Sequence, residues 1–144
     1  MSAFNILLVE DNEGDVMITQ HAFAGWRDDC GLAIARNGIE ALEYLHRQGQ
    51  FTNARKPDLI LLDVNMPVMD GKECLKRLKQ DDELRLVPVV MFTSSRAPSD
   101  ILDCYKFQVS SYVVKPFGPR AYIDTVRQVV TFWSDLAQRP SATW

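Results

Sequence analysis

Short apolar runs alternate with longer amphipathic segments along almost the whole chain, and this alternation restricts the fold more than any other feature. Apolar runs of this kind are typical of strands buried in a parallel sheet, and the amphipathic segments between them are typical of crossover helices. The pattern predicts strands at residues 4–9, 33–34, 58–62, 89–92 and 111–114. It predicts helices at about 13–24, 39–48 and 119–137, a helix that carries Leu75 and Leu78, and a short helix at 101–105.

These five strand–helix units account for nearly all of the 144 residues. Connections between parallel strands are right-handed, so the helices should cover both faces of one sheet. We therefore predict an α/β fold with a doubly wound, five-stranded parallel sheet in the order 2-1-3-4-5. The polar segment 49–57 is expected to be a loop.

The composition excludes several classes of protein. The net charge of −3 gives no electrostatic support for nucleic-acid binding, and no apolar run reaches the roughly 18 residues of a membrane span. Cys30, Cys74 and Cys104 are far apart and form no C-x-x-C pair, which argues against a disulfide framework or a zinc site. We expect a soluble cytoplasmic protein with reduced thiols.

Polar side chains follow four of the predicted strands directly. Glu10 and Asp11 follow the first strand and Asp63 follows the third, while Thr93 ends the fourth. Lys115 comes directly after the fifth strand. In an open parallel sheet, ligands bind at the carboxyl ends of the strands where the strand order reverses. The sequence therefore predicts one small polar cluster at that edge.

Three carboxylates in one cluster repel one another, and a divalent cation such as Mg²⁺ would relieve that repulsion. A carboxylate can also attack phosphorus to form an aspartyl phosphate. That reaction depends mainly on neutralising the phosphoryl oxygens, which a metal, the Lys115 ammonium and the Thr93 hydroxyl could do together. Taken singly, each residue has an ordinary structural role, such as a helix cap, a turn residue or a solvated strand end.

Four motifs resemble response-regulator receiver domains, in order and at the family's separations. They are Leu-Val-Glu-Asp-Asn at 8–12, Leu-Leu-Asp-Val-Asn-Met-Pro-Val-Met-Asp-Gly at 61–71, Phe-Thr-Ser at 92–94 and Val-Lys-Pro-Phe at 114–117. The resemblance extends over about residues 4–133 and implies the flavodoxin-like (βα)5 fold. It assigns residues 1–137 to a receiver domain and 138–144 to a C-terminal tail. No output domain is expected, because only eight residues follow Leu136.

The resemblance also implies roles for individual residues. Asp63 would be the phosphoacceptor, and Mg²⁺ or Mn²⁺ would be bound by Asp11, Asp63 and the backbone carbonyl of Asn65. Glu10 would act on the metal through water.

On the phosphoryl side, the resemblance implies that Thr93 and Lys115 contact the phosphoryl group, with the backbone amide of Ser94 nearby. Tyr112 would be the switch residue that turns inward when Thr93 moves, although a strand tyrosine is also common in ordinary packing. A cis peptide bond is implied between Lys115 and Pro116.

Within the family, the chain is similar to stand-alone regulators paired with bacterial and cyanobacterial phytochrome histidine kinases. The polar loop at 48–57 and the Phe132-Trp133 pair near the end of the last helix carry this closer similarity. A sensor histidine kinase, expected to be a phytochrome, would then be the partner. A chemotaxis-type stand-alone regulator is the alternative.

The last predicted helix is apolar on more than one side. A stripe expected to pack on the sheet consists of Tyr122, Val126, Val129, Val130 and Trp133. Ile123, Phe132 and Leu136 lie off that stripe. An extra apolar surface of this kind either packs elsewhere in the chain or meets another protein. We expect a homodimer formed through this helix and the tail at 134–144.

Other classes of function fit less well. A phosphohydrolase of the haloacid-dehalogenase kind needs a second acid two residues after its aspartate nucleophile, but that position holds Asn65, which cannot transfer a proton. A binding module that has lost phosphorylation would not be expected to keep the whole acidic cluster. Neither a P-loop motif nor a dinucleotide-binding glycine motif occurs.

Overall fold

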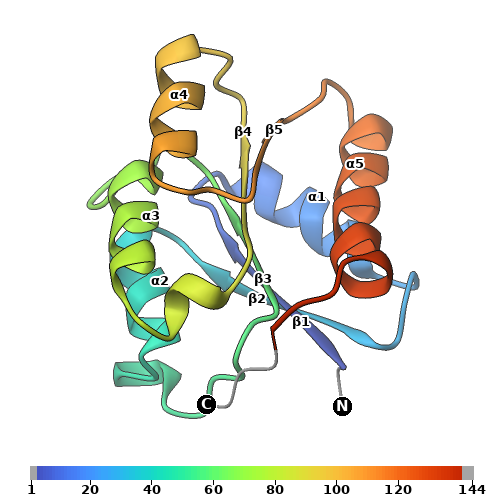
Figure 1. The fold of residues 1–144 in the computed structure, drawn as a ribbon. Coiled ribbons are helices and arrows are strands. Elements are labelled where there is room, and N and C mark those ends of the chain that lie inside the picture. Colours follow the sequence, from blue (N-terminus) through green and yellow to red (C-terminus); the bar gives the residue numbers. More distant parts are fainter. Residues whose placement is uncertain (1–2, 141–144) are drawn as a thin grey trace.

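Five parallel strands form one sheet in the order β2-β1-β3-β4-β5 (Figure 1). The computed structural model describes residues 3–140. The strands are β1 (Phe4–Val9), β2 (Cys30–Ala35), β3 (Leu59–Leu62), β4 (Val89–Thr93) and β5 (Ser111–Val114). The predicted fold class and strand order are confirmed.

Helices cover both faces of this sheet (Figure 1). The helices α1 (Glu13–Phe23) and α5 (Pro119–Thr131) lie on one face. The other face is covered by α2 (Gly38–Leu45), α3 (Gly71–Gln80) and α4 (Pro98–Lys106). In the described part of the chain, no helix has the length and apolar character needed to cross a membrane.

Side chains of each strand alternate between two hydrophobic clusters, one on each face of the sheet. On β3, Ile60 and Leu62 join the cluster under α2, α3 and α4, whereas Leu59 and Leu61 join the cluster under α1 and α5. All four side chains are buried. Burying a leucine or isoleucine side chain stabilises a fold by roughly 1.5–3 kcal/mol, so β3 anchors both layers of helices.

Side-chain caps fix where three of the helices begin. Asn12 caps α1, Asn37 caps α2 and Asp70 caps α3, and each accepts a hydrogen bond of 2.9 Å from the backbone amide three residues later. Such a cap stabilises a helix by about 1 kcal/mol and sets the direction in which the chain leaves the preceding strand. The starts of α1 and α3 are therefore held near the ends of β1 and β3.

Two elements differ in extent from the prediction. The strand β2 covers six residues instead of two and pairs with β1 along its whole length. Its glycine and alanine residues weaken the apolar signal, and every residue except Ala35 is only partly buried. In the predicted loop, residues Gly49–Phe51 form a single 3-10 turn, η1, and a second such turn, η2, covers Leu84–Leu86.

The last helix continues beyond α5 as a π-helical turn, η3, at Phe132–Leu136. Tyr122, Val126 and Val130 are buried against the sheet, as predicted. Ile123, which lies off the predicted stripe, is partly buried and packs on the same cluster, so this residue packs within the chain.

The segment after η3 turns back onto its own chain. The Arg139 guanidinium forms an ion pair of 2.9 Å with Asp58 and lies 4.7 Å from the centre of the Phe4 ring. The part of the expected dimer tail that the structure describes therefore contacts the amino ends of β1 and β3. The rest of that tail, residues 141–144, lies outside the described residues.

The expected cis bond between Lys115 and Pro116 is wrong, because all peptide bonds within residues 3–140 are trans. The trans form is the favoured one even before proline. The Lys115 side chain reaches the Asp63 carboxylate from a trans backbone, at 3.0 Å.

Gly71, the first residue of α3, passes close to the chain just after β3. Its amide donates a 2.8 Å hydrogen bond to the Val64 carbonyl, and a Cβ atom at this position would lie 1.9 Å from the Asp63 carbonyl oxygen. We expect Gly71→Ala to lower the free energy of unfolding by about 3 kcal/mol or more, since the backbone of the site must move. Urea unfolding measures this change.

The matched control is Gly14→Ala, also in the first turn of a helix. Its Cβ would meet only the flexible Asn12 side chain, at 3.3 Å. We expect a change within about 1 kcal/mol, because alanine favours helix and the contact can relax. Equal destabilisation by the two substitutions would contradict the close approach at Gly71.

Candidate functional site

The backbone holds the candidate residues at one edge of the sheet by extending the strand pairing beyond the strand ends. The Glu10 amide donates to the Ala35 carbonyl at 2.9 Å, and the Asp63 amide donates to the Val9 carbonyl at 3.1 Å. The Lys115 amide donates to the Thr93 carbonyl at 2.8 Å. The side chains at these positions are therefore presented from adjacent strands at fixed spacing.

Three carboxylates meet at this edge. One oxygen from each of Glu10, Asp11 and Asp63 lies within 4.8 Å of the others. Glu10 is only 1% exposed and Asp63 8% exposed, whereas Asp11 faces solvent. Burial, together with the nearby charge of Asp63, raises the pKa of Glu10 to about 7. The carboxylates of the cluster therefore repel one another, and a bound cation would reduce this repulsion.

The Lys115 ammonium is the cation that the structure itself supplies. It donates hydrogen bonds to Asp15 at 2.7 Å and to Asp63 at 3.0 Å, and a further one to Glu10. Burial alone would lower the pKa of Lys115, but these carboxylates outweigh it and the pKa is raised. Lys115 therefore stays charged and lies directly against the Asp63 carboxylate.

Thr93 and Tyr112 are linked through Ser95, in the segment between β4 and α4. The buried Thr93 hydroxyl accepts a hydrogen bond of 3.3 Å from the Ser95 amide. The Tyr112 hydroxyl donates to the Ser95 carbonyl at 2.9 Å, and its half-buried ring packs against the core. One residue of the β4–α4 segment thus contacts both side chains.

Asn65 lies two residues beyond Asp63, where the chain turns back over the end of β3. Its amide approaches one Asp63 carboxylate oxygen at 3.4 Å, and its side chain is exposed. The other carboxylate oxygen of Asp63 accepts a hydrogen bond from the Lys115 ammonium. The two oxygens of Asp63 therefore have different surroundings.

The donor set fits a divalent metal. Carboxylate and carbonyl oxygens are the ligands of Mg²⁺ and Mn²⁺, which commonly take one or two carboxylates and complete their coordination with water. Asp11 and Asp63 offer such oxygens beside Glu10. Glu10 is already engaged by Lys115 and by the Asn12 amide at 3.1 Å, which suits a role through water more than direct coordination.

Sequence reasoning missed Asp15. This residue lies in the first turn of α1 and forms an ion pair of 2.7 Å with Lys115. A signal was present, because the Asn12 cap starts α1 directly after the acidic pair and so keeps the first turn at the same edge. Asp15 was overlooked because acids in a first helical turn usually serve the helix dipole.

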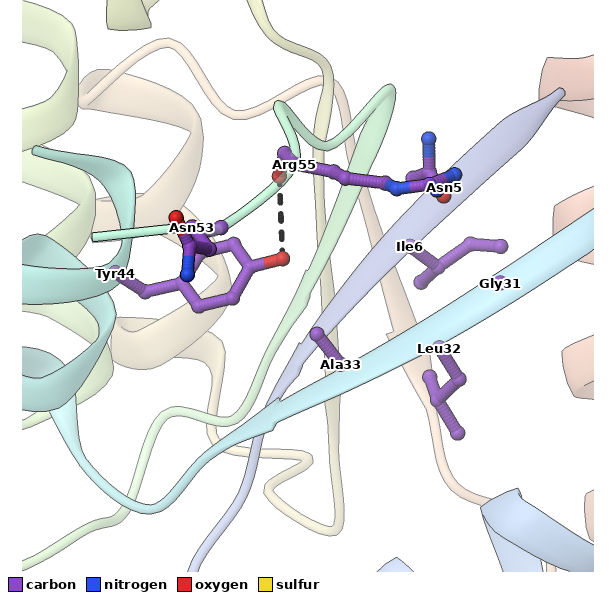
Figure 2. Close-up of a pocket in the computed structure, with 9 residues that line it drawn as sticks. Asn5, Ile6, Gly31, Leu32, Ala33, Tyr44, Asn53 and Arg55 are labelled. Carbon is purple, nitrogen blue, oxygen red and sulfur yellow. Dashed lines mark hydrogen bonds between the residues drawn. The ribbon is translucent and has the colours of Figure 1, made fainter. Parts of the chain in front are cut away.

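A separate pocket of about 370 Å³ lies at the opposite ends of the strands (Figure 2). Asn5 and Gly31, near the starts of β1 and β2, line it together with Arg55. The Tyr44 hydroxyl donates to the Arg55 carbonyl at 3.1 Å across one wall. None of the carboxylates described above lines this pocket, so the chemistry belongs to the other edge of the sheet.

Comparison with known proteins gives a consistent family. Residues 6–127 match the model of the response regulator receiver domain. Response regulator Rcp1 of the cyanobacterium Synechocystis is 35% identical over 137 residues, which cover 95% of this chain and 93% of Rcp1.

Two solved structures resemble the fold over nearly its whole length. The Mn²⁺-bound form of Rcp1 has a TM-score of 0.88 at 34% identity and covers 96% of this chain and 99% of that one. The phosphorylated cyanobacterial phytochrome response regulator RcpA has a TM-score of 0.92 at 36% identity and covers 97% and 100%. The chain therefore belongs to the response regulator receiver domain family, and its relatives include regulators of phytochrome signalling.

Proposed function

We propose that this protein is a phosphorylation switch in which Asp63 accepts a phosphoryl group from the phosphohistidine of a partner kinase. The observation that carries the proposal is the Lys115 ammonium held 3.0 Å from an Asp63 carboxylate oxygen, beside two further carboxylates. A cation already placed at the acceptor can neutralise the incoming phosphoryl oxygens.

The transfer forms a bond between an Asp63 carboxylate oxygen and phosphorus, and the bond from phosphorus to the kinase imidazole breaks. The imidazole nitrogen leaves with that electron pair and takes a proton from solvent. Asp11, Asp63 and the carbonyl of Asn65 would hold Mg²⁺ or Mn²⁺, with Glu10 acting through water. The ion would supply positive charge to the phosphoryl oxygens. The buried Thr93 hydroxyl would donate a hydrogen bond to one of them.

The response would pass through Ser95, which both Thr93 and Tyr112 contact. A Thr93 hydroxyl that turns toward a phosphoryl oxygen gives up the Ser95 amide, and Tyr112 then adjusts to the moved segment. The phosphoryl group can shift the equilibrium toward the arrangement with the Thr93 hydroxyl turned toward it only to the extent that it interacts more strongly with that arrangement than with the first. Output would follow as contact with other proteins. The domain would also catalyse slow hydrolysis of its own aspartyl phosphate.

The partner kinase in this proposal is a phytochrome. The similarity to Rcp1 and to the phytochrome regulator RcpA supports this choice over a chemotaxis-type partner. The kinase draws its phosphoryl group from ATP, which places the reaction in the cytoplasm. Residues 1–137 form the receiver unit.

Incubation with acetyl phosphate and Mg²⁺ tests the proposal directly. We expect intact mass spectrometry to show one added phosphoryl group per chain, because a small acyl phosphate can replace the kinase as donor. Asp63→Asn should abolish the addition, and chelation of the metal should slow it by at least tenfold.

Control reactions separate the acceptor from other acids. Asp58→Asn, at the amino end of β3, should be phosphorylated like wild type. Phosphorylation that persists in Asp63→Asn, or an unmodified wild-type chain, would contradict the proposal. Turnover of a generic phosphate ester would support a phosphohydrolase instead.

We further propose that the chain forms a homodimer through the outer side of α5 and η3. Phe132 is 47% exposed and Leu136 71% exposed, and both line a groove of about 710 Å³ together with Trp26. Arg127 and Asp135 border the same groove, so the apolar surface has a charged rim of both signs. Such a rim can pair with itself across a two-fold axis.

Light scattering tests this second proposal. We expect a dimer mass for the wild type and a monomer mass for Phe132→Glu, since a buried unpaired charge at an interface costs several kcal/mol. Leu86→Glu is the matched control, because Leu86 is also 47% exposed but lies in η2, away from the groove. A monomer mass for the wild type both with and without phosphorylation would exclude the dimer.

A further inference from the structure

Within residues 3–140, Asp15 is the one carboxylate partner of Lys115 that lies outside the cluster of Glu10, Asp11 and Asp63. We propose that Asp15 is a releasable tether that holds the Lys115 ammonium in the unphosphorylated protein and thereby weakens the affinity of the site for phosphoryl groups. This inference rests on the proposed function of Asp63. It adds a positioning residue that tunes how readily that site is filled.

An ammonium group has three N–H donors, and in this structure Lys115 uses them on Glu10, Asp15 and Asp63. When Asp63 becomes an acyl phosphate, only the donor that faced Asp63 is free for the phosphoryl oxygens. A second donor becomes available only if Lys115 leaves another carboxylate.

The burial of Glu10 and Asp15 determines which of these carboxylates Lys115 releases. The Glu10 side chain is 1% exposed, so releasing it would leave a buried charge without its cation. The Asp15 side chain is 25% exposed, and water can replace the lost hydrogen bond. Asp15 is therefore the partner that Lys115 gives up more easily. The need to break this contact works against phosphorylation.

The charge of Asp15 also opposes phosphoryl binding. Asp15 adds a negative charge 2.7 Å from the ammonium that must meet a dianionic phosphoryl group. Neutralising Asp15 removes this competitor while leaving Lys115 held by Glu10 and Asp63. The rest of the local structure does not depend on the Asp15 carboxylate. The side chain of Asn12 caps α1, and it is the Asp15 carbonyl that accepts from Thr19 and Tyr122.

The test is the affinity for beryllofluoride, a phosphoryl-shaped anion, in the presence of Mg²⁺. Calorimetric titration of the full chain gives the Kd without any transfer step. We expect Asp15→Asn to bind roughly fivefold more tightly than wild type, the scale of one partly exposed ion pair. The KM for acetyl phosphate should fall by a similar factor, with a smaller change in the maximal rate. Asp15→Glu, which keeps the charge, should stay near the wild-type Kd.

Glu13→Gln is the matched control. Glu13 lies in the same first turn of α1, is 69% exposed and pairs with Arg36 instead of Lys115. Like Asp15→Asn, the substitution Glu13→Gln removes one negative charge and the interaction of that charge with the helix dipole. Because Glu13 does not contact Lys115, the Kd of this variant for beryllofluoride should stay within twofold of wild type. Asp15→Ala provides a second neutral variant, and thermal unfolding checks that each variant is folded.

The outcomes separate the two proposals. Tighter binding by both neutral Asp15 variants, but not by Glu13→Gln, supports the tether. Unchanged or weaker binding by folded Asp15→Asn, with a wild type that binds beryllofluoride, overturns the tether and leaves the proposed function standing. A wild type that neither binds beryllofluoride nor accepts a phosphoryl group overturns both.

Discussion

The Lys115 ammonium is the interaction on which the arrangement of the site depends. It joins β5 to carboxylates from the end of β1, from α1 and from the end of β3. Removing one partner of a buried ion pair typically costs about 3–5 kcal/mol, because the remaining charges are left without compensation. Glu10 and Asp63, which are both buried, can therefore lie side by side only while a cation stays between them. A bound metal ion would compensate the negative charge of these carboxylates in the same way as Lys115 does.

The sequence predicted the fold well where burial is complete. Each residue of Leu59–Leu62 is buried, so this apolar run needed no other interpretation. The five polar motif residues at the ends of four strands lie at one edge because parallel strands end together. The prediction was poorer at the sheet edge. The strand β2 is held mainly by its pairing with β1, and its Cys30, Gly31 and Ala33 carry little apolar signal of their own.

Other features depend on contacts between residues far apart in the chain, and periodicity does not report these. Asp15 meets Lys115 across 100 positions, and Arg139 meets Asp58 across 81. Ile123 lies off the apolar stripe of its helix, but it is partly buried and packs against the hydrophobic cluster under α1 and α5. A helical pattern shows which side of one helix is apolar. It does not show how much of the surface a second helix will cover.

The same contacts suggest how a change at Asp63 reaches the surface. The Ser95 carbonyl accepts a hydrogen bond from the Tyr112 hydroxyl. The Ser95 hydroxyl donates a hydrogen bond of 2.5 Å to Asp100 of α4. Lys72 of α3 forms an ion pair of 2.6 Å with Asp100 and so links α4 to α3. This link lies beside Ser95, whose amide contacts the Thr93 hydroxyl. Coupling between sites commonly amounts to about 1–3 kcal/mol, which is on the scale of a few such hydrogen bonds. A shift of Ser95 would therefore act on α4 through the contact with Asp100.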